Sequence, residues 1–205
     1  MEVFVVLPVF NEEKALTPLL LRFVALAQRA PLQLGLVVVN DGSSDHALKS
    51  RPYSALLPID VFQHDTNRGL GQTIRDGLTR AAYTAGPEDI VVTMDADNSH
   101  PHELILEMVE RLRDGNDVVI ASRYRKSAQV VGVSRVRRLM SHCERLVFEL
   151  VASIPNVRDY TCGFRAYRVG PLRRVLDQFD DQDTPKQSWW NGPNWHGIVL
   201  ASPLL

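Results

Sequence analysis

Short apolar runs alternate with amphipathic segments through residues 3–121, and this alternation constrains the fold more than any other feature of the chain. The runs are rich in β-branched residues, as strands buried on both faces are. The segments between them carry apolar residues at helical spacing. Parallel strands need such crossovers, and those crossovers are right-handed. The pattern therefore predicts an α/β fold with a single doubly wound, mostly parallel sheet.

The expected elements follow from these runs. We predict strands at 3–7, 34–39, 59–63, 90–94 and 117–121, and helices at 11–29, 72–85 and 101–113. The carboxyl ends of parallel strands meet at one edge of the sheet, where open α/β folds bind ligands. The loops expected at that edge are polar or contain glycine; they are residues 8–13, 40–45, 64–71, 95–102 and 122–126.

Asp95 and Asp97 directly follow the strand expected at 90–94. Two such close anions repel each other, and burying them together is costly unless a cation lies between them. Mg²⁺ or Mn²⁺ bound together with a diphosphate would supply that cation. The alternative is a plain turn at the end of a strand, because Asp and Asn are common there.

Two other loops at the same edge have a functional and a structural interpretation. Asp41 could accept a hydrogen bond from a base N–H or a ribose hydroxyl, as the acidic residue of dinucleotide folds does. Gly69 and Gly71 could let the backbone approach a ligand at the start of a helix. A plain turn at 40–45 and an ordinary helix-start loop at 67–71 are the alternatives.

Composition limits the classes of partner. The 205 residues, 45% of them apolar, suffice for one domain with a sizeable core. A net charge of −1 argues against nucleic acid as a partner. Residues 123–145 nevertheless form a local basic patch, with Glu144 as their one acid. The patch would attract an anion, and a solvated helix face is the alternative.

Simple sequence patterns also predict where the protein is located and the state of its two cysteines. No charged and apolar leader follows Met1, and no window reaches the ~18 apolar residues of a membrane span, so we expect a cytoplasmic protein, soluble or peripheral on the cytoplasmic face of a membrane. Cys143 and Cys162 fit no zinc spacing and are expected to be free thiols. His100 and His102 are expected to be surface or helix-capping residues.

The last part of the chain differs from the rest. Residues 179–205 lose both the helical and the strand pattern and contain all three tryptophans, Trp189, Trp190 and Trp195. We therefore expect one domain at 1–178 and an irregular or disordered tail at 179–205. The tail suggests a truncated or frameshifted product.

Six sequence blocks occur in order along the chain: PVFNE at 8–12, NDGSSD at 40–45, NRGLG at 67–71, MDADNSHP at 94–101, ASRY at 121–124 and DYTCGFRAY at 159–167. Together they resemble the inverting nucleotide-sugar glycosyltransferases, and most closely the dolichol-phosphate (polyprenyl-phosphate) mannose synthase group. The resemblance covers about residues 1–178 and implies a glycosyltransferase A type fold with a Rossmann-like nucleotide-binding half. Asn40, Asn98 and Cys162 depart from the usual Asp, apolar residue and Ser of the group.

The resemblance also implies roles for individual residues. Pro8, Phe10, Glu12, Asp41 and Asp95 would bind the nucleotide, with Asp41 meeting the base. Asp95, Asp97 and Ser99 would hold Mg²⁺ or Mn²⁺ beside the diphosphate, and Asp97 and Arg123 would be catalytic. Arg123, Arg137 and Ser141 would bind the acceptor phosphate. A spacing of four places Arg137 and Ser141 on one helix face, and an arginine with a hydroxyl suits a phosphate monoester.

The implied activity is metal-dependent transfer of a hexose, mannose or glucose, with inversion. The donor would be a nucleoside diphosphate sugar, GDP-mannose or UDP-glucose, and the acceptor a polyprenyl or dolichyl phosphate. Two alternatives stay open: a nucleotide-sugar binding module with little or no turnover, and a related transferase with a saccharide or protein acceptor.

Overall fold

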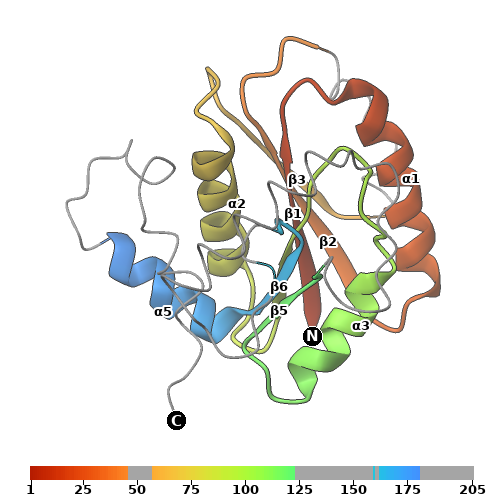
Figure 1. The fold of residues 1–205 in the computed structure, drawn as a ribbon, viewed down its shortest axis with the longest axis vertical. Coiled ribbons are helices and arrows are strands. Elements are labelled where there is room, and N and C mark those ends of the chain that lie inside the picture. The colour runs from red at the N-terminus through yellow and green to blue at the C-terminus, as the bar shows by residue number, and fades with distance from the viewer. Residues whose placement is uncertain (46–56, 123–158, 160–161, 181–205) are drawn as a thin grey trace.

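The computed structural model describes residues 1–45, 57–122, 159 and 162–180, and Figure 1 shows its elements. In chain order they are β1 (Glu2–Val9), α1 (Glu13–Arg29), β2 (Gln33–Asn40), β3 (Ile59–Gln63), α2 (Leu70–Thr84), β4 (Ile90–Thr93), α3 (Leu104–Arg113), β5 (Val118–Ile120), β6 (Arg165–Arg168) and α5 (Val169–Asp180). The predicted α/β class is confirmed, and each predicted strand and helix in the described residues is present.

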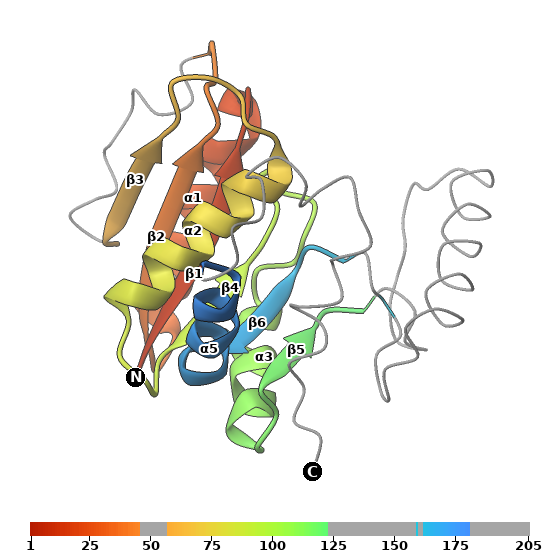
Figure 2. The same ribbon diagram turned by 90° about the vertical axis from the view of Figure 1, so that its left-hand side faces the viewer.

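The strands form one six-stranded sheet in the order β3-β2-β1-β4-β6-β5, which can be followed across Figure 2. β1 pairs in parallel with β2 and β4, and β2 pairs in parallel with β3. β6 runs antiparallel to both β4 and β5. The sheet is therefore mostly parallel, as predicted. The antiparallel strand β6 was not predicted, because its sequence, Arg165–Arg168, has no continuous apolar run.

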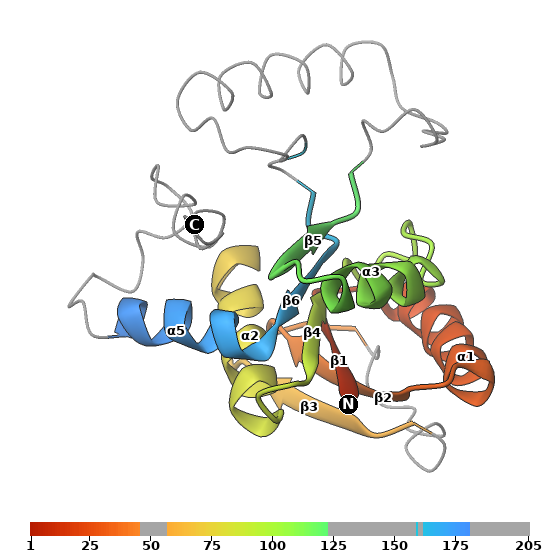
Figure 3. The same cartoon turned by 90° about the horizontal axis from the view of Figure 1, so that it is seen from below.

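Helices cover both faces of this sheet. Apolar side chains of α1 and α3 pack with Val3, Val5 and Leu7 on one face. Those of α2 and α5 pack with Val6 and Val37 on the other. Figure 3 shows the two pairs of helices on opposite sides of the strands. Successive residues of β1 thus point into different cores, which explains why its apolar run is continuous.

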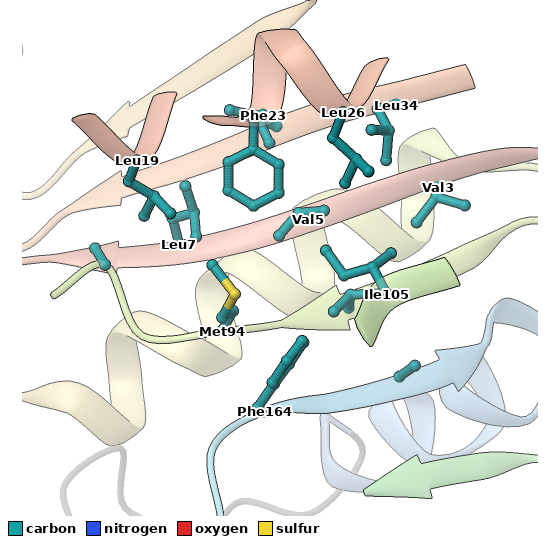
Figure 4. Packing of buried hydrophobic residues seen from close by; sticks show 14 of the residues in the cluster. Val3, Val5, Leu7, Leu19, Phe23, Leu26, Leu34, Met94, Ile105 and Phe164 are labelled. Carbon is teal, nitrogen blue, oxygen red and sulfur yellow. The ribbon is translucent and has the colours of Figure 1, made fainter. Parts of the chain in front are cut away.

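Figure 4 shows the larger core, where Phe23 of α1 and Phe164, just before β6, are both fully buried. The smaller core demands a very close approach of α2 to the sheet. A Cβ on Gly77 would lie 2.4 Å from Cγ1 of Val6. Glycine at this position therefore lets α2 lie directly against β1, which in turn sets where the amino end of α2 stands.

Most predicted boundaries lie within two residues of the observed ones, and the start of α3 differs most. α3 begins at Leu104 rather than at 101, because residues 101–103 form turns in which Pro101 and His102 carbonyls accept the first N–H groups of the helix. The helix α5 was not predicted from the sequence; it ends at Asp180. Among the helices in the described part of the chain, none combines the length and apolarity needed to cross a bilayer.

Candidate functional site

A pocket of about 300 Å³ opens at the carboxyl ends of β1 and β4. The strand order reverses here, since β2 and β3 lie on one side of β1 and β4 lies on the other. Open α/β sheets bind their ligands at such a reversal. Its lining residues are Pro8, Val9, Phe10, Glu12, Asp41, Asn67, Leu70, Thr73, Asp95, Ala96 and Asp97. We call Asp41, Asn67, Leu70 and Thr73 the α2 side, and Asp95, Ala96 and Asp97 the β4 side.

Asp41 is the most enclosed carboxylate of the pocket, at 3% exposure. Its Oδ1 accepts a hydrogen bond from the Arg68 N–H at 2.8 Å and lies 2.7 Å from Nδ1 of His64, while Oδ2 accepts from the Gly69 N–H at 2.9 Å. Burial alone would raise the pKa of Asp41. The hydrogen bonds from Arg68, His64, Thr73 and Gly69 outweigh burial and hold this pKa below its ordinary 3.8. Asp41 is therefore ionised, and the protein itself binds both its oxygens.

The loop after β1 is tied to the loop after β2 by side-chain caps. Asn11 adopts φ +57°, its N–H donates to Ser43 Oγ at 3.0 Å, and its Oδ1 accepts from the Ser44 N–H at 2.9 Å. Asp45 Oδ2 accepts from the Glu13 N–H at 2.8 Å and so satisfies the first turn of α1. These bonds hold the segment that carries Phe10 and Glu12 at the mouth of the pocket.

Gly42 joins this arrangement to the loop before α2. Its φ is +71°, and a Cβ there would lie 2.7 Å from the backbone N of Asn67. Only glycine combines that conformation with that closeness. The loop after β2 therefore rests directly on the backbone of residues 66–67, next to the α2 side.

The β4 side is open by comparison. The Asp95 side chain is 40% exposed, and its Oδ2 lies 3.1 Å from Nε2 of His100. Asp97 is exposed, and its Oδ1 accepts from the Ser99 N–H at 2.9 Å. Among the described residues, Oδ1 of Asp95 and Oδ2 of Asp97 accept no hydrogen bond. Both carboxylates thus keep an oxygen available for a ligand.

The segment that leads into β6 supports Asp95 from behind. Thr93 Oγ1 donates to the Gly163 carbonyl at 2.7 Å, and a Cβ on Gly163 would lie 3.2 Å from Oδ1 of Asp95. The ring of His100 lies 5.2 Å from the ring of Phe164. The sixth sequence block, at 159–167, therefore contacts the fourth in space.

The structure gathers six of the predicted site residues at this pocket: Pro8, Phe10, Glu12, Asp41, Asp95 and Asp97. Ser99 is exposed, is not among the lining residues and contacts Asp97 through its backbone. Arg123, Arg137, Ser141 and Cys143 lie outside the described residues, as does the tail beyond Asp180. Cys162 is buried, and its Sγ donates to the Ala121 carbonyl at 3.1 Å.

Sequence reasoning missed several residues around the pocket. The pocket is also lined by Asn67, Leu70 and Thr73. His64 is buried behind Asp41 and contacts its carboxylate. Apart from the glycine loop itself, no local pattern distinguishes these residues from ordinary helix-start residues. The expectation for His102 was wrong: it is 3% exposed, and its ring packs edge-on against Phe23 at 5.9 Å. Its buried position arises from the packing of the α3 entry on α1.

The oxygen atoms of the β4 side fit a hard divalent cation. Mg²⁺ is typically held by one or two carboxylates together with substrate phosphates, and Asp95 and Asp97 provide two carboxylates. Within the described ranges, no group of three or more His, Cys, Asp or Glu side chains could hold a metal ion. Asp95 and Asp97 would thus supply two oxygen ligands of such a cation.

Comparison with known proteins agrees with this site. The glycosyl transferase family 2 pattern matches residues 4–176, so the chain belongs to that family. It is 32% identical over 170 residues to a dolichol-phosphate mannosyltransferase of Pyrococcus furiosus, a match that covers 82% of this chain and 46% of that protein. It is 35% identical over 184 residues to an undecaprenyl-phosphate 4-deoxy-4-formamido-L-arabinose transferase of Pseudomonas aeruginosa, covering 85% and 49%.

The predicted resemblance to polyprenyl-phosphate sugar transferases is therefore confirmed. The chain spans about half the length of these curated relatives.

Solved structures with the same fold are glycosyltransferases of the A type. Mannosyl-3-phosphoglycerate synthase from Rubrobacter xylanophilus superposes with a TM-score of 0.61 at 20% identity, covering 82% of this chain and 53% of that one. Glucosyl-3-phosphoglycerate synthase from Mycobacterium tuberculosis, in complex with Mn²⁺, UDP and glucosyl-3-phosphoglycerate, gives 0.58 at 20% identity, covering 87% and 65%. The predicted fold type is thus confirmed.

Proposed function

We propose that this chain transfers a hexose, mannose or glucose, from a nucleoside diphosphate sugar to a polyprenyl or dolichyl phosphate, with inversion at the anomeric carbon. One observation carries the proposal: a pocket at the strand-order reversal brings Phe10, Glu12 and Asp41 together with the open carboxylates Asp95 and Asp97. The relatives include a dolichol-phosphate mannosyltransferase and undecaprenyl-phosphate 4-deoxy-4-formamido-L-arabinose transferases, which supports the acceptor class.

Pro8, Phe10, Glu12 and the α2 side would bind the nucleotide of GDP-mannose or UDP-glucose. The β4 side and Ser99 would hold Mg²⁺ or Mn²⁺ against the diphosphate. The cation, when bound, supplies positive charge to the leaving diphosphate. Asp95 and Asp97 would orient the cation and the diphosphate, because both carboxylates stand on a short loop that Gly163 and His100 contact.

The acceptor would need no general base. A phosphate monoester, whose second pKa is about 6, is mostly dianionic at neutral pH and is already a nucleophile. Its oxygen would attack the anomeric carbon while the bond from that carbon to the diphosphate oxygen breaks, which inverts the configuration. Arg123, Arg137 and Ser141 keep the acceptor-phosphate role that the resemblance implies. We propose that the reaction takes place on the cytoplasmic face of a membrane, with this chain bound there as a peripheral protein.

Two measurements test the proposal. The first is a thermal-shift panel of nucleoside diphosphate sugars with and without Mn²⁺; a ligand present at 100 times its Kd should add roughly 2.7 kcal/mol to the free energy of unfolding. The second follows labelled sugar into solvent-extractable lipid when polyprenyl phosphate is supplied.

Stabilisation by one donor together with labelled lipid supports the proposal. Stabilisation without label in lipid, saccharide or protein would favour a binding module, and label in a saccharide or protein would favour the other transferase class. A chain stabilised by no nucleotide sugar would contradict all three.

A further inference from the structure

His64 is a buried titratable residue to which the proposed function gives no task. It follows β3, its side chain is 1% exposed, and both its ring nitrogens face carboxylates. Nδ1 lies 2.7 Å from Asp41 Oδ1, and Nε2 lies 3.0 Å from Asp76 Oδ2 on α2. The ring also packs edge-on against Phe62 at 5.3 Å. A buried imidazole held by three neighbours has one orientation available to it.

The partner of Nδ1 is the residue that organises the α2 side. Asp41 accepts the Arg68 and Gly69 N–H groups, so its carboxylate fixes the backbone just before α2. That backbone positions Asn67 and Leu70, both of which line the pocket. The Asp41 side chain is only 4% exposed, and most of its acceptor capacity is taken by groups of the protein itself. The carboxylate therefore holds the protein's own loop in addition to lining the pocket.

From this geometry we infer that His64 is a positioning residue for the donor nucleotide, acting through Asp41. The Nδ1 proton of His64 holds the Asp41 carboxylate in the orientation that receives the two backbone N–H groups. The α2 side then presents Asn67 and Leu70 to the nucleotide without rearrangement on binding. The contact with Asp76 is secondary: Asp76 is 24% exposed in its side chain and already accepts from Gln72 Nε2 at 2.7 Å.

Three substitutions separate this role from simple core packing. In His64→Asn the amide nitrogen takes the place of Nδ1 and still reaches Asp41. In His64→Gln the amide takes the place of Nε2 and faces Asp76 instead. His64→Leu removes both donors and keeps the apolar bulk. All three lose some stability, because each alters a buried side chain.

The inference rests on the proposed function, because it concerns the affinity for a nucleoside diphosphate. The dissociation constants of UDP and GDP are measured by calorimetry on folded protein, with and without Mn²⁺. For whichever of the two binds, His64→Leu and His64→Gln should weaken binding at least 10-fold, about 1.4 kcal/mol. His64→Asn should stay within about 3-fold of the unmodified chain. The losses should be the same with and without Mn²⁺, because His64 acts on the α2 side alone.

The matched control is His102→Leu. His102 is equally buried but packs between α1 and the entry of α3, away from the α2 side. It should lower the melting temperature and leave both dissociation constants unchanged. If all three His64 variants lower the melting temperature yet bind the nucleotide as the unmodified chain does, His64 is only a packing residue and the inference is wrong, while the proposed function stands. If the unmodified chain binds neither UDP nor GDP, both are overturned.

Discussion

Asp41 follows β2 and Asp95 follows β4 in the same sheet, yet one carboxylate is buried and the other is partly exposed. Asp41 is 3% exposed and bonded by two backbone N–H groups and one imidazole. The Asp95 side chain is 40% exposed and has one described partner, His100. A carboxylate whose oxygens are occupied shapes the protein around it, whereas one with a free oxygen can bind a cation. Residues of the same type are thus occupied by the protein on the α2 side and open to a ligand on the β4 side.

The largest effect should come from Asp97→Ala on the β4 side. In the proposed reaction this carboxylate is a ligand of the cation that neutralises the leaving diphosphate, so its removal should lower sugar transfer at least ~100-fold. The melting temperature should change little, because Asp97 is exposed. Label incorporated into extractable lipid measures the effect. Asp114→Ala, an exposed change at the carboxyl end of α3, is the control and should transfer normally. Unchanged transfer by Asp97→Ala would remove the metal assignment.

Gly42→Ala should break the α2 side through the backbone instead. An L residue at φ +71° costs about 1–2 kcal/mol, and the clash of its Cβ with the Asn67 backbone adds about 1–3 kcal/mol. Urea unfolding measures the sum. Gly115→Ala is matched, because Gly115 has φ +100° but open space around a Cβ, so it should show the first cost alone. Equal losses at both positions would show that the loop yields freely.

The contribution of Asp41 to the stability of the α2 side should be lost only below about pH 3.8. The pKa of Asp41 is lowered on folding, so its contribution to stability is complete above about pH 3.8 and is lost as the pH falls through the lower folded value. Asp41→Asn should therefore be destabilised at pH 7 by about 1–3 kcal/mol, as expected when a buried charged hydrogen-bond acceptor is replaced. The difference from the unmodified chain should shrink below pH 3.8. A difference that stays constant in denaturant titrations down to pH 3 would contradict this.

His102, which packs between α1 and the entry of α3, should respond at higher pH. Burial lowers its pKa below the ordinary 6.5, with Arg22 and Arg29 adding to this and Glu103 opposing it. Folded protein therefore binds fewer protons than unfolded protein, so stability is complete above pH 6.5 and falls as the pH drops below it. His102→Leu should flatten that slope between pH 6.5 and 5. An unchanged slope in the variant would assign the pH dependence to another group.

The smallest effect should follow from His100→Leu. Its contact with the partly exposed Asp95 is worth ~1 kcal/mol or less, so transfer should fall by no more than about 5-fold. Assays over a range of Mn²⁺ concentrations should show a weaker apparent affinity for the metal with saturated rates preserved. A loss as large as that of Asp97→Ala would mean that His100 contacts the substrate itself.

Much of this molecule followed from local patterns. The apolar runs predict β1, β2 and β4 and their parallel pairing, and the common edge of parallel strands predicts that Asp41, Asp95 and Asp97 lie together. The runs carry this information because strands buried on both faces need continuous apolar sequence. β6 escaped prediction because Arg165 and Arg168 interrupt its run, although Arg165 is buried and its Nε donates to the Cys162 carbonyl at 2.7 Å.

The sequence by itself determined the fold class, the family and the set of carboxylates at the pocket, since all of these depend on periodicity and on short ordered blocks. Only the tertiary structure decided which carboxylate is occupied and which is open. That difference depends on long-range contacts. The N–H groups of Arg68 and Gly69, 27 and 28 positions along the chain, donate to Asp41, and the buried ring of His64, 23 positions along, contacts the same carboxylate. Local sequence carries no record of those contacts, because burial and hydrogen bonding are set by how β2, β3 and α2 pack together.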